Sequence, residues 1–180
     1  AEDVTIRTEA VSRSLFGHTL VVAEESASVT ILERSSSEAG AEPRYVSNVV
    51  EVVAGENSYV QYGSLQTLDE ESYHYTLKRA DVARHGTANW IEGNVGSRLT
   101  RSDVETELTG DGSETKIVGA FFGHEDQHFD VNARVWHHGE HTTADLVTRG
   151  VLDDDARSVY EGVQDVGRDA WDTSSYQREN

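Results

Sequence analysis

The stretch Phe129-Asp130-Val131-Asn132-Ala133-Arg134-Val135-Trp136 decides the fold, because two kinds of residue alternate along it. Its odd-numbered members are Phe, Val, Ala and Val, and its even-numbered members are Asp, Asn, Arg and Trp. Successive side chains of a β-strand point to opposite faces, so this two-residue period predicts a strand. The segment Tyr73–Lys78 alternates in the same manner, with Tyr, Tyr and Leu on one side and His, Thr and Lys on the other.

A short unit recurs through the chain: an apolar strand, a polar turn that ends in a small residue, and a second strand. Six copies align on the small residue, with spacings of 31, 28, 26, 30 and 28, at Ala27, Ser58, Gly86, Gly112, Thr142 and Ala170. A period of this length is typical of repeat architectures, and strand-like units favour a β-solenoid among them. We therefore predict an all-β solenoid of about six repeats of roughly 28 residues.

Helical periodicity is weak throughout, and Asp153–Val159 is the segment that favours a short helical turn. The longest polar stretch, Ser35–Pro43, is expected to leave the regular stack. We expect residues 1–180 to form a single domain. Because a solenoid unit cannot cover its own hydrophobic face, we also expect both ends to be cut, so that the chain is the core of a larger protein.

The charge balance is strongly acidic, with 33 acidic residues, 15 basic residues and a net charge of −18. Molar salt screens the resulting repulsion, so this composition indicates a halophilic protein. It also argues against nucleic-acid binding, since no basic stripe is present. The sequence lacks a membrane-spanning apolar stretch and a signal peptide, which predicts a soluble, cytoplasmic protein that binds no membrane. The chain has no cysteine, which excludes cysteine-ligated iron–sulfur sites and thiolate nucleophiles within it.

A cluster of histidines is the first candidate for chemistry. Five of them fall within 18 residues and are accompanied by carboxylates: His124, His128, His137, His138 and His141. Imidazole and carboxylate groups together ligate divalent metals. On a strand, however, His137 and His138 would face opposite sides, and His137 and His141 would share a face. We interpret the cluster as surface and turn histidines, with a His124–His141 metal-binding domain as the alternative.

Other motifs predict no reactive site. Asp153–Asp155 and Glu70–Glu71 lack the spacing of a calcium loop and are expected to be solvated. The glycine strings 93–98 and 119–123 lack the setting of a phosphate loop and are interpreted as coil corners. No Gly-x-Ser-x-Gly motif occurs, and Trp90, Trp136 and Trp171 are expected to be core or interface anchors. We assign no catalytic, cofactor-binding or metal-binding residue.

Four strings of the sequence resemble a known family. They are the segments 18–33 (HTLVVAEESASVTILE), 141–152 (HTTADLVTRGVL), 157–162 (RSVYEG) and 175–180 (SYQREN). In this order they resemble the core of the SufB/SufD family of iron–sulfur cluster assembly proteins, from about His18 to Asn180. The segment 173–180 resembles the SufD form, since SufB typically carries a functional cysteine there and this chain has none.

The resemblance implies a right-handed parallel β-helix, flanked in the family by helical regions that are absent from this chain. It further implies a non-catalytic scaffold that pairs with a SufB-like paralogue and a SufC-like ATPase and binds no cofactor itself, and a homodimer in isolation is a further expectation. The SufC-docking and cluster-linked residues of the family are expected beyond Asn180. The last two units, from Thr142 onward, are expected to approach the SufB pairing surface. A free-standing β-solenoid enzyme acting on polysaccharide is the alternative from another class.

Overall fold

The computed structural model describes residues 2–40 and 42–180, and these residues form thirteen β-strands and no helix. A seven-stranded sheet contains β1 (Glu2–Glu9), β3 (Ser28–Ser36), β5 (Tyr59–Thr67), β7 (Thr87–Asn94), β9 (Glu114–Gly123), β11 (Thr143–Leu152) and β13 (Ser174–Glu179). A six-stranded sheet contains β2 (Ser14–Ala23), β4 (Arg44–Ala54), β6 (Ser72–Val82), β8 (Leu99–Leu108), β10 (His128–His137) and β12 (Arg157–Val166). Within the described residues, no helix is long and apolar enough to cross a membrane.

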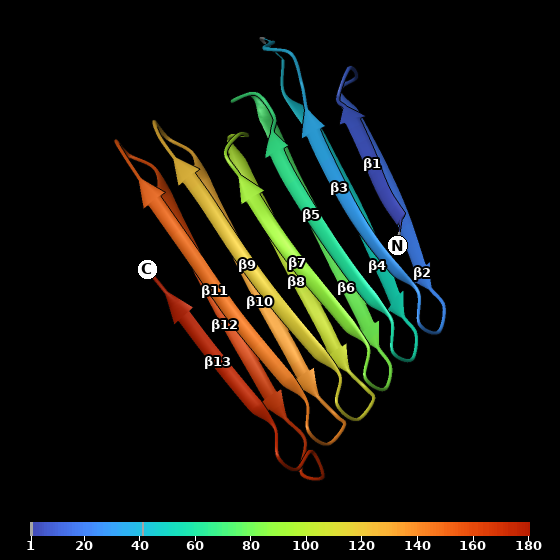
Figure 1. Cartoon of the computed structure of the whole chain (residues 1–180). Helices are drawn as coiled ribbons and strands as arrows, with labels where there is room; N and C mark the ends of the chain where they lie inside the picture. Colours follow the sequence, from blue (N-terminus) through green and yellow to red (C-terminus); the bar gives the residue numbers. More distant parts are fainter. Residues whose placement is uncertain (1, 41) are drawn as a thin grey trace.

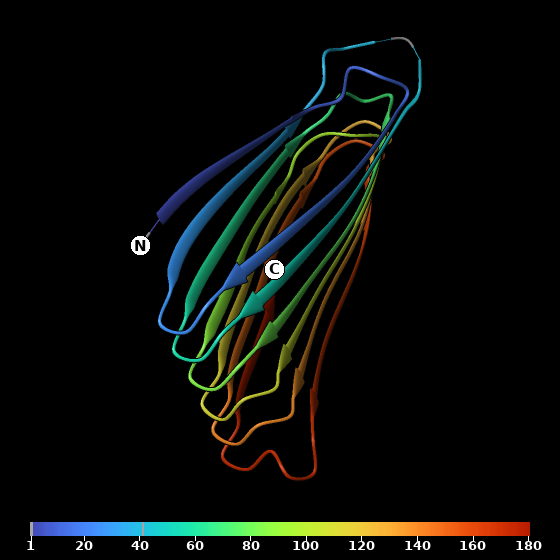
Figure 2. The same ribbon diagram turned by 90° about the vertical axis from the view of Figure 1, so that its right-hand side faces the viewer.

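Both sheets are parallel, and the chain passes from one to the other at every turn (Figures 1 and 2). Each coil therefore contributes one strand to each sheet, and consecutive coils stack in register. The ladder that joins Val29, Val60, Ala88, Thr115, Ala144 and Ser175 places successive coils 27 to 31 residues apart. The predicted β-solenoid of about six repeats is confirmed.

Two of the six predicted repeat anchors were misaligned. Each coil enters the seven-stranded sheet directly after Ala27, Ser58, Gly86, Ser113, Thr142 and Thr173. Ser113, and not Gly112, is thus the equivalent of Gly86, and Thr173, and not Ala170, is the equivalent of Thr142. The turn between β12 and β13 has seven residues, 167–173, which displaced the last anchor by three positions.

Gly112 instead belongs to a set of residues, one in each of these turns, whose backbone has the left-handed conformation. The residue just before each corrected anchor has a positive φ of 53° to 66°: Ser26, Asn57, His85, Gly112, His141 and Asp172. The backbone N–H of His85 donates to the carbonyl of Asp111 in the next coil (2.9 Å), and Gly112 N–H donates to Glu140 in the same way (2.8 Å). Ser26, Asn57 and His141 donate their backbone N–H to a carbonyl of the following coil in the same way.

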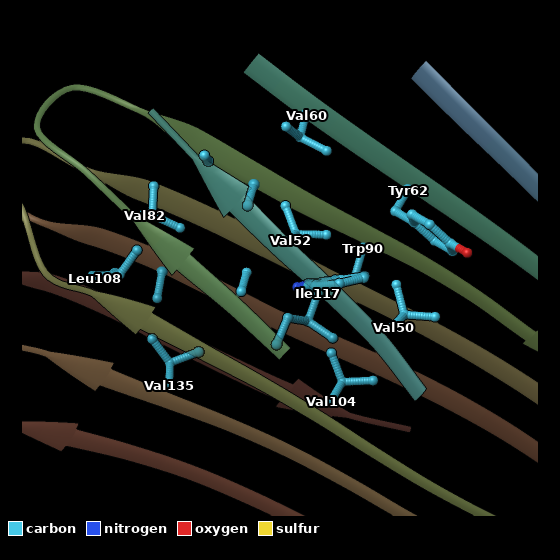
Figure 3. Close-up of a cluster of buried hydrophobic side chains, with 14 of the residues drawn as sticks. Val50, Val52, Val60, Tyr62, Val82, Trp90, Val104, Leu108, Ile117 and Val135 are labelled. Atoms are coloured by element: carbon cyan, nitrogen blue, oxygen red, sulfur yellow. The ribbon is translucent and has the colours of Figure 1, made fainter. Parts of the chain in front are cut away.

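The core lies between the two sheets and is built from buried apolar side chains of both (Figure 3). In the centre, Tyr62, Trp90 and Ile117 follow one another along the seven-stranded sheet, opposite Val50 and Val104 of the other sheet. Trp90 is fully buried, and its Nε1–H donates to Thr106 Oγ1 (3.1 Å). Each Å² of apolar surface removed from water stabilises the fold by about 25 cal/mol, and this burial is the main stabilising contribution.

Two local predictions are resolved by the turns. Of the stretch 35–43 that was predicted to leave the stack, Ser35 and Ser36 remain paired in β3, and residues 37–40, 42 and 43 lie between β3 and β4, with residue 41 outside the described residues. The prediction of a short helical turn over Asp153–Val159 is wrong: residues 153–156 form a β-turn and β12 begins at Arg157. Strand β12 forms here because its residues pair one by one with those of β10, beginning with Arg157 opposite His128.

Arginines on the outer surface connect neighbouring coils. Arg101 donates to Asp130 (2.7 Å), Arg134 to Glu161 (2.8 Å) and Arg98 to Asp126 (2.7 Å), in each case 27 to 29 residues along the chain. Each exposed pair contributes little by itself, because water and salt screen the two charges. Because they recur at the coil spacing, they offset part of the repulsion between acidic residues of stacked strands.

Candidate functional site

The five clustered histidines are divided between the two ends of the solenoid. His124 and His128 lie where β9 passes into β10, and His137, His138 and His141 lie where β10 passes into β11. Strand β10 has ten residues, so at about 3.3 Å per residue its ends are about 30 Å apart. The histidines from His124 to His141 therefore do not form one site.

The three histidines at the far end have separate environments. His137 is fully buried, its Nδ1 lies 2.7 Å from Thr142 Oγ1, and burial lowers its pKa. His138 is exposed and its Nε2 lies 3.2 Å from Glu107. His141 lies in the turn, with its ring 3.6 Å from Asp172. The expectation that His137 and His141 share a face is wrong, because the chain turns between them.

The remaining predicted motifs are placed as follows. Asp153–Asp155 is exposed in the turn between β11 and β12. Gly96 lies at a coil corner as interpreted, whereas Gly93, Gly119 and Gly123 lie in strands β7 and β9, so the corner interpretation is wrong for those three. Of the tryptophans, Trp90 is in the core and Trp171 is 65% exposed in the last turn.

Polar side chains line part of the solenoid interior, which sequence reasoning missed. The alternation of Tyr73–Lys78 is present, but the inward members are the polar ones: His74, Thr76 and Lys78 are buried while Tyr75 is exposed. They face polar inward residues of the other sheet. The buried polar set here is Glu33, Asn48, Gln66, His74, Thr76, Lys78, Glu92, Asn94 and Thr100.

Buried charges in this region have partners. Glu33 accepts a hydrogen bond from the hydroxyl of Tyr62 (2.8 Å), and burial together with this carboxylate raises the pKa of Tyr62 well above its ordinary value. Lys78 Nζ donates to Glu92 Oε2 (2.5 Å) and to Ser64 Oγ (2.7 Å). Buried ions persist only when paired and hydrogen-bonded, and the Lys78 contacts join the two sheets, whereas the Glu33–Tyr62 bond joins neighbouring strands of one sheet.

His74 is a second buried group of this region whose pKa departs far from its ordinary value. Its Nδ1 has no hydrogen-bond partner among the described residues. Burial, reinforced by the positive charge of Lys78, lowers the pKa of His74 to about 3. The ring is therefore neutral at physiological pH.

Gln66 ties the interior to a turn. Its amide Nε2 donates to Ser97 Oγ (2.8 Å) and Thr100 Oγ1 (3.1 Å), and its Oε1 accepts from the backbone N–H of Gly96 (2.9 Å). These contacts hold the turn between β7 and β8 against the preceding coil. The sequence does contain polar residues at the inward positions of successive strands. They can be recognised as one set only once the register between the strands is known.

Exposed apolar side chains lie on both end coils, and those of the first coil include Phe16, Leu20 and Val22. Val159 and Val163 of β12 are 55% and 36% exposed, and Tyr176 of β13 is 51% exposed. Strands β12 and β13 stand at the ends of their sheets in the described part of the chain.

A two-sheet parallel β-solenoid with an interior network of paired polar groups defines a strand-based repeat protein. Residues 5–180 match the model of the SUF system FeS cluster assembly, SufBD core domain. The chain therefore belongs to the SufBD family of iron–sulfur cluster assembly proteins.

Curated relatives carry the same family name. The chain is 29% identical over 155 residues to an iron–sulfur cluster assembly SufBD family protein of Staphylococcus saprophyticus. It is 28% identical over 155 residues to those of Staphylococcus epidermidis and Staphylococcus aureus. Each alignment covers 86% of this chain and 33% of the relative, so the chain spans about one third of the length of these relatives.

Proposed function

We propose that this chain is the SufD-like β-helix core of a cytoplasmic SufBCD complex in a halophile. There it acts as a non-catalytic scaffold that pairs with a SufB-like paralogue and works with a SufC-like ATPase. The family match over residues 5–180 supports the assembly role. The observation that carries the scaffold assignment is the stack itself, in which each coil is bonded to its neighbours along both sheets.

The interior explains why the chain suits this role. Stacked repeats contact only their neighbours, so stiffness depends on each interface between coils. The pair Lys78–Glu92 and the contacts of Gln66 cross between sheets and coils, which resists sliding. Such a rod presents its flank to partners without changing shape, and the nascent cluster is the cargo of the complex.

The assignment to the SufD-like branch rests on the last strand. The chain has no cysteine, so β13 lacks the thiol that SufB typically carries in this segment. We infer that the chain itself holds no iron–sulfur cluster through sulfur, and that cluster chemistry belongs to the partner.

The pairing surface is proposed to be the last coil, from Thr142 onward. Val159 and Val163 lie on the outer face of β12, where their exposure leaves apolar area for a partner to cover. Leu20, on β2 at the opposite end of the same sheet, is 58% exposed and provides a matched control.

The test is co-purification in molar salt of the full-length tagged protein with its SufB-like and SufC-like partners. We expect Val159→Glu and Val163→Glu to reduce recovery of the SufB-like partner at least about tenfold, the effect of about 1.4 kcal/mol. Leu20→Glu should leave it unchanged. Unchanged recovery with the β12 variants would refute the pairing surface, and failure of the unsubstituted protein to recover either partner would refute the assembly role.

A further inference from the structure

A notch lies at one end of the solenoid because one turn is short. The register pairs Gln66, Asn94 and Phe121 along one sheet and Tyr73, Leu99 and His128 along the other. The chain takes seven residue steps from Gln66 to Tyr73 and from Phe121 to His128, but five from Asn94 to Leu99. The turn between β7 and β8 is therefore recessed between two longer turns, and a groove of about 560 Å³ lies there.

The floor of this notch is held in place. A Cβ on Gly96 would lie 2.0 Å from the carbonyl oxygen of Leu68, so only glycine lets this turn lie flush against the preceding one. Gln127 is 2% exposed; its Nε2 donates to the carbonyl of Ser97 (2.9 Å) and its Oε1 accepts from the N–H of His124 (3.0 Å). The backbone that carries His124 is thus fixed to the floor.

Three potential ligands meet across the notch. Glu70 comes from the turn between β5 and β6, and His124 and Glu125 come from the turn between β9 and β10, two coils away. One ligand atom from each lies within 4.8 Å of the others, and His124 Nε2 is 4.0 Å from Glu70 Oε1. Three atoms within 4.8 Å of one another share a point that is no more than about 2.8 Å from any of them, against about 2.0–2.2 Å in metal sites. Side-chain rotations that move each ligand atom by less than about 1 Å would bring all three to metal-binding distance.

The neighbouring charges favour a cation. Arg98, the nearest arginine of the short turn, is engaged by Asp126 (2.7 Å) and Glu71 (3.8 Å). Among the described residues, no lysine or arginine nitrogen lies within 4 Å of the carboxylates of Glu70 and Glu125. Two carboxylates therefore remain available in a chain whose net charge is −18.

We propose that Glu70, His124 and Glu125 bind one divalent first-row transition-metal ion, with water in the remaining coordination positions. One imidazole and two carboxylates suit Zn²⁺, Co²⁺ or Mn²⁺, whereas Mg²⁺ and Ca²⁺ prefer oxygen ligands throughout. Bound there, the ion ties together coils that are not adjacent. This departs from the sequence-based expectation that the chain holds no metal, and it does not depend on the assembly role.

The test is titration of the chain with Co²⁺ alone, followed by its ligand-field absorption and by calorimetry, with circular dichroism to verify folding. We expect one ion per chain, displaced by Zn²⁺ but not by excess Mg²⁺. His124→Ala should weaken binding by more than the roughly 10–100-fold that loss of an outer-shell partner costs. Glu70→Gln and Glu125→Gln, which preserve shape, should also weaken it.

The matched control is His138→Ala, which removes an exposed histidine beside a single carboxylate, Glu107, at the other end of the solenoid. It should bind Co²⁺ like the unsubstituted chain. Absence of saturable binding, equal affinity in the Glu70→Gln variant, or displacement by Mg²⁺ at the same concentration as Zn²⁺ would overturn the site. None of these outcomes bears on recovery of the SufB-like partner.

Discussion

The ammonium group of Lys78 lies 2.5 Å from the carboxylate of Glu92, inside the solenoid and between its two sheets. Both side chains are 4% exposed, and they come from different sheets. Lys78 is one of two lysines in the chain. Its burial in an otherwise lysine-poor, acidic protein shows that the pair has a structural role in the interior.

Breaking this pair from one side should be costly. We expect Lys78→Met to lower the free energy of unfolding by about 3–5 kcal/mol, because it leaves the Glu92 carboxylate buried and unpaired. The double variant Lys78→Met, Glu92→Met should recover most of that loss, since neither charge remains. Denaturant unfolding of Lys78→Met, Glu92→Met and the double variant measures these free energies. A double variant that is no more stable than the single variants would contradict the prediction.

Acidification should destabilise the fold through His74. Its pKa is about 3 in the fold against an ordinary 6.5, so below pH 6.5 the unfolded chain binds a proton that the folded chain excludes. Stability is therefore lost as the pH falls from about 6.5 toward 3, by up to about 1.4 kcal/mol per pH unit. His74→Asn removes this contribution.

The difference between the unfolding free energies of the unsubstituted chain and His74→Asn, measured from pH 7.5 to pH 4, isolates the effect. The carboxylates contribute to both curves and cancel. The difference should move in favour of the variant as the pH falls, and a difference that stays constant with pH would show that His74 is not buried in its neutral form.

Stacked turns should make some glycines irreplaceable. A Cβ on Gly110 would lie 2.0 Å from the backbone nitrogen of Arg84, whereas a Cβ on Gly63 would make ordinary contacts at 3.6 Å and beyond. We expect Gly110→Ala to lower the free energy of unfolding by about 1–3 kcal/mol, because the backbone must shift to make room for the methyl group. Gly63→Ala should be neutral or stabilising by up to about 1 kcal/mol. Thermal unfolding of both variants checks this, and equal effects would contradict the close stacking of the turns.

Salt should stabilise the chain. With 33 acidic and 15 basic residues, repulsion between carboxylates outweighs the attraction in the arginine–carboxylate ion pairs. Raising KCl from about 0.1 to 1 M shortens the Debye length from about 10 to 3 Å and so screens this repulsion. The midpoint of thermal unfolding should therefore rise. A variant with exposed Asp155 and Asp169 changed to Asn should gain less from the same salt, and a midpoint that falls with salt would refute the prediction.

The local pattern of residues determined the strands and their stacking. The alternation in Phe129–Trp136 is local, and the structure buries Phe129 and Val135 on one face as that alternation requires. The repeat spacing predicted the solenoid for the same reason, since each coil must bury its apolar face against the next. The anchors failed at Gly112 and Ala170 because turn lengths vary from coil to coil.

Tertiary structure decided which face of each strand is inside and which distant residues meet. Alternation gives a period of two but not its phase, so whether Tyr75 or Thr76 faces the core depended on the polar side chains that the opposite sheet supplies. Likewise Glu70 and His124, which are 54 residues apart, come together because the intervening turn is short. Such contacts follow from the register between coils, which is a property of the whole stack and not of any one stretch of residues.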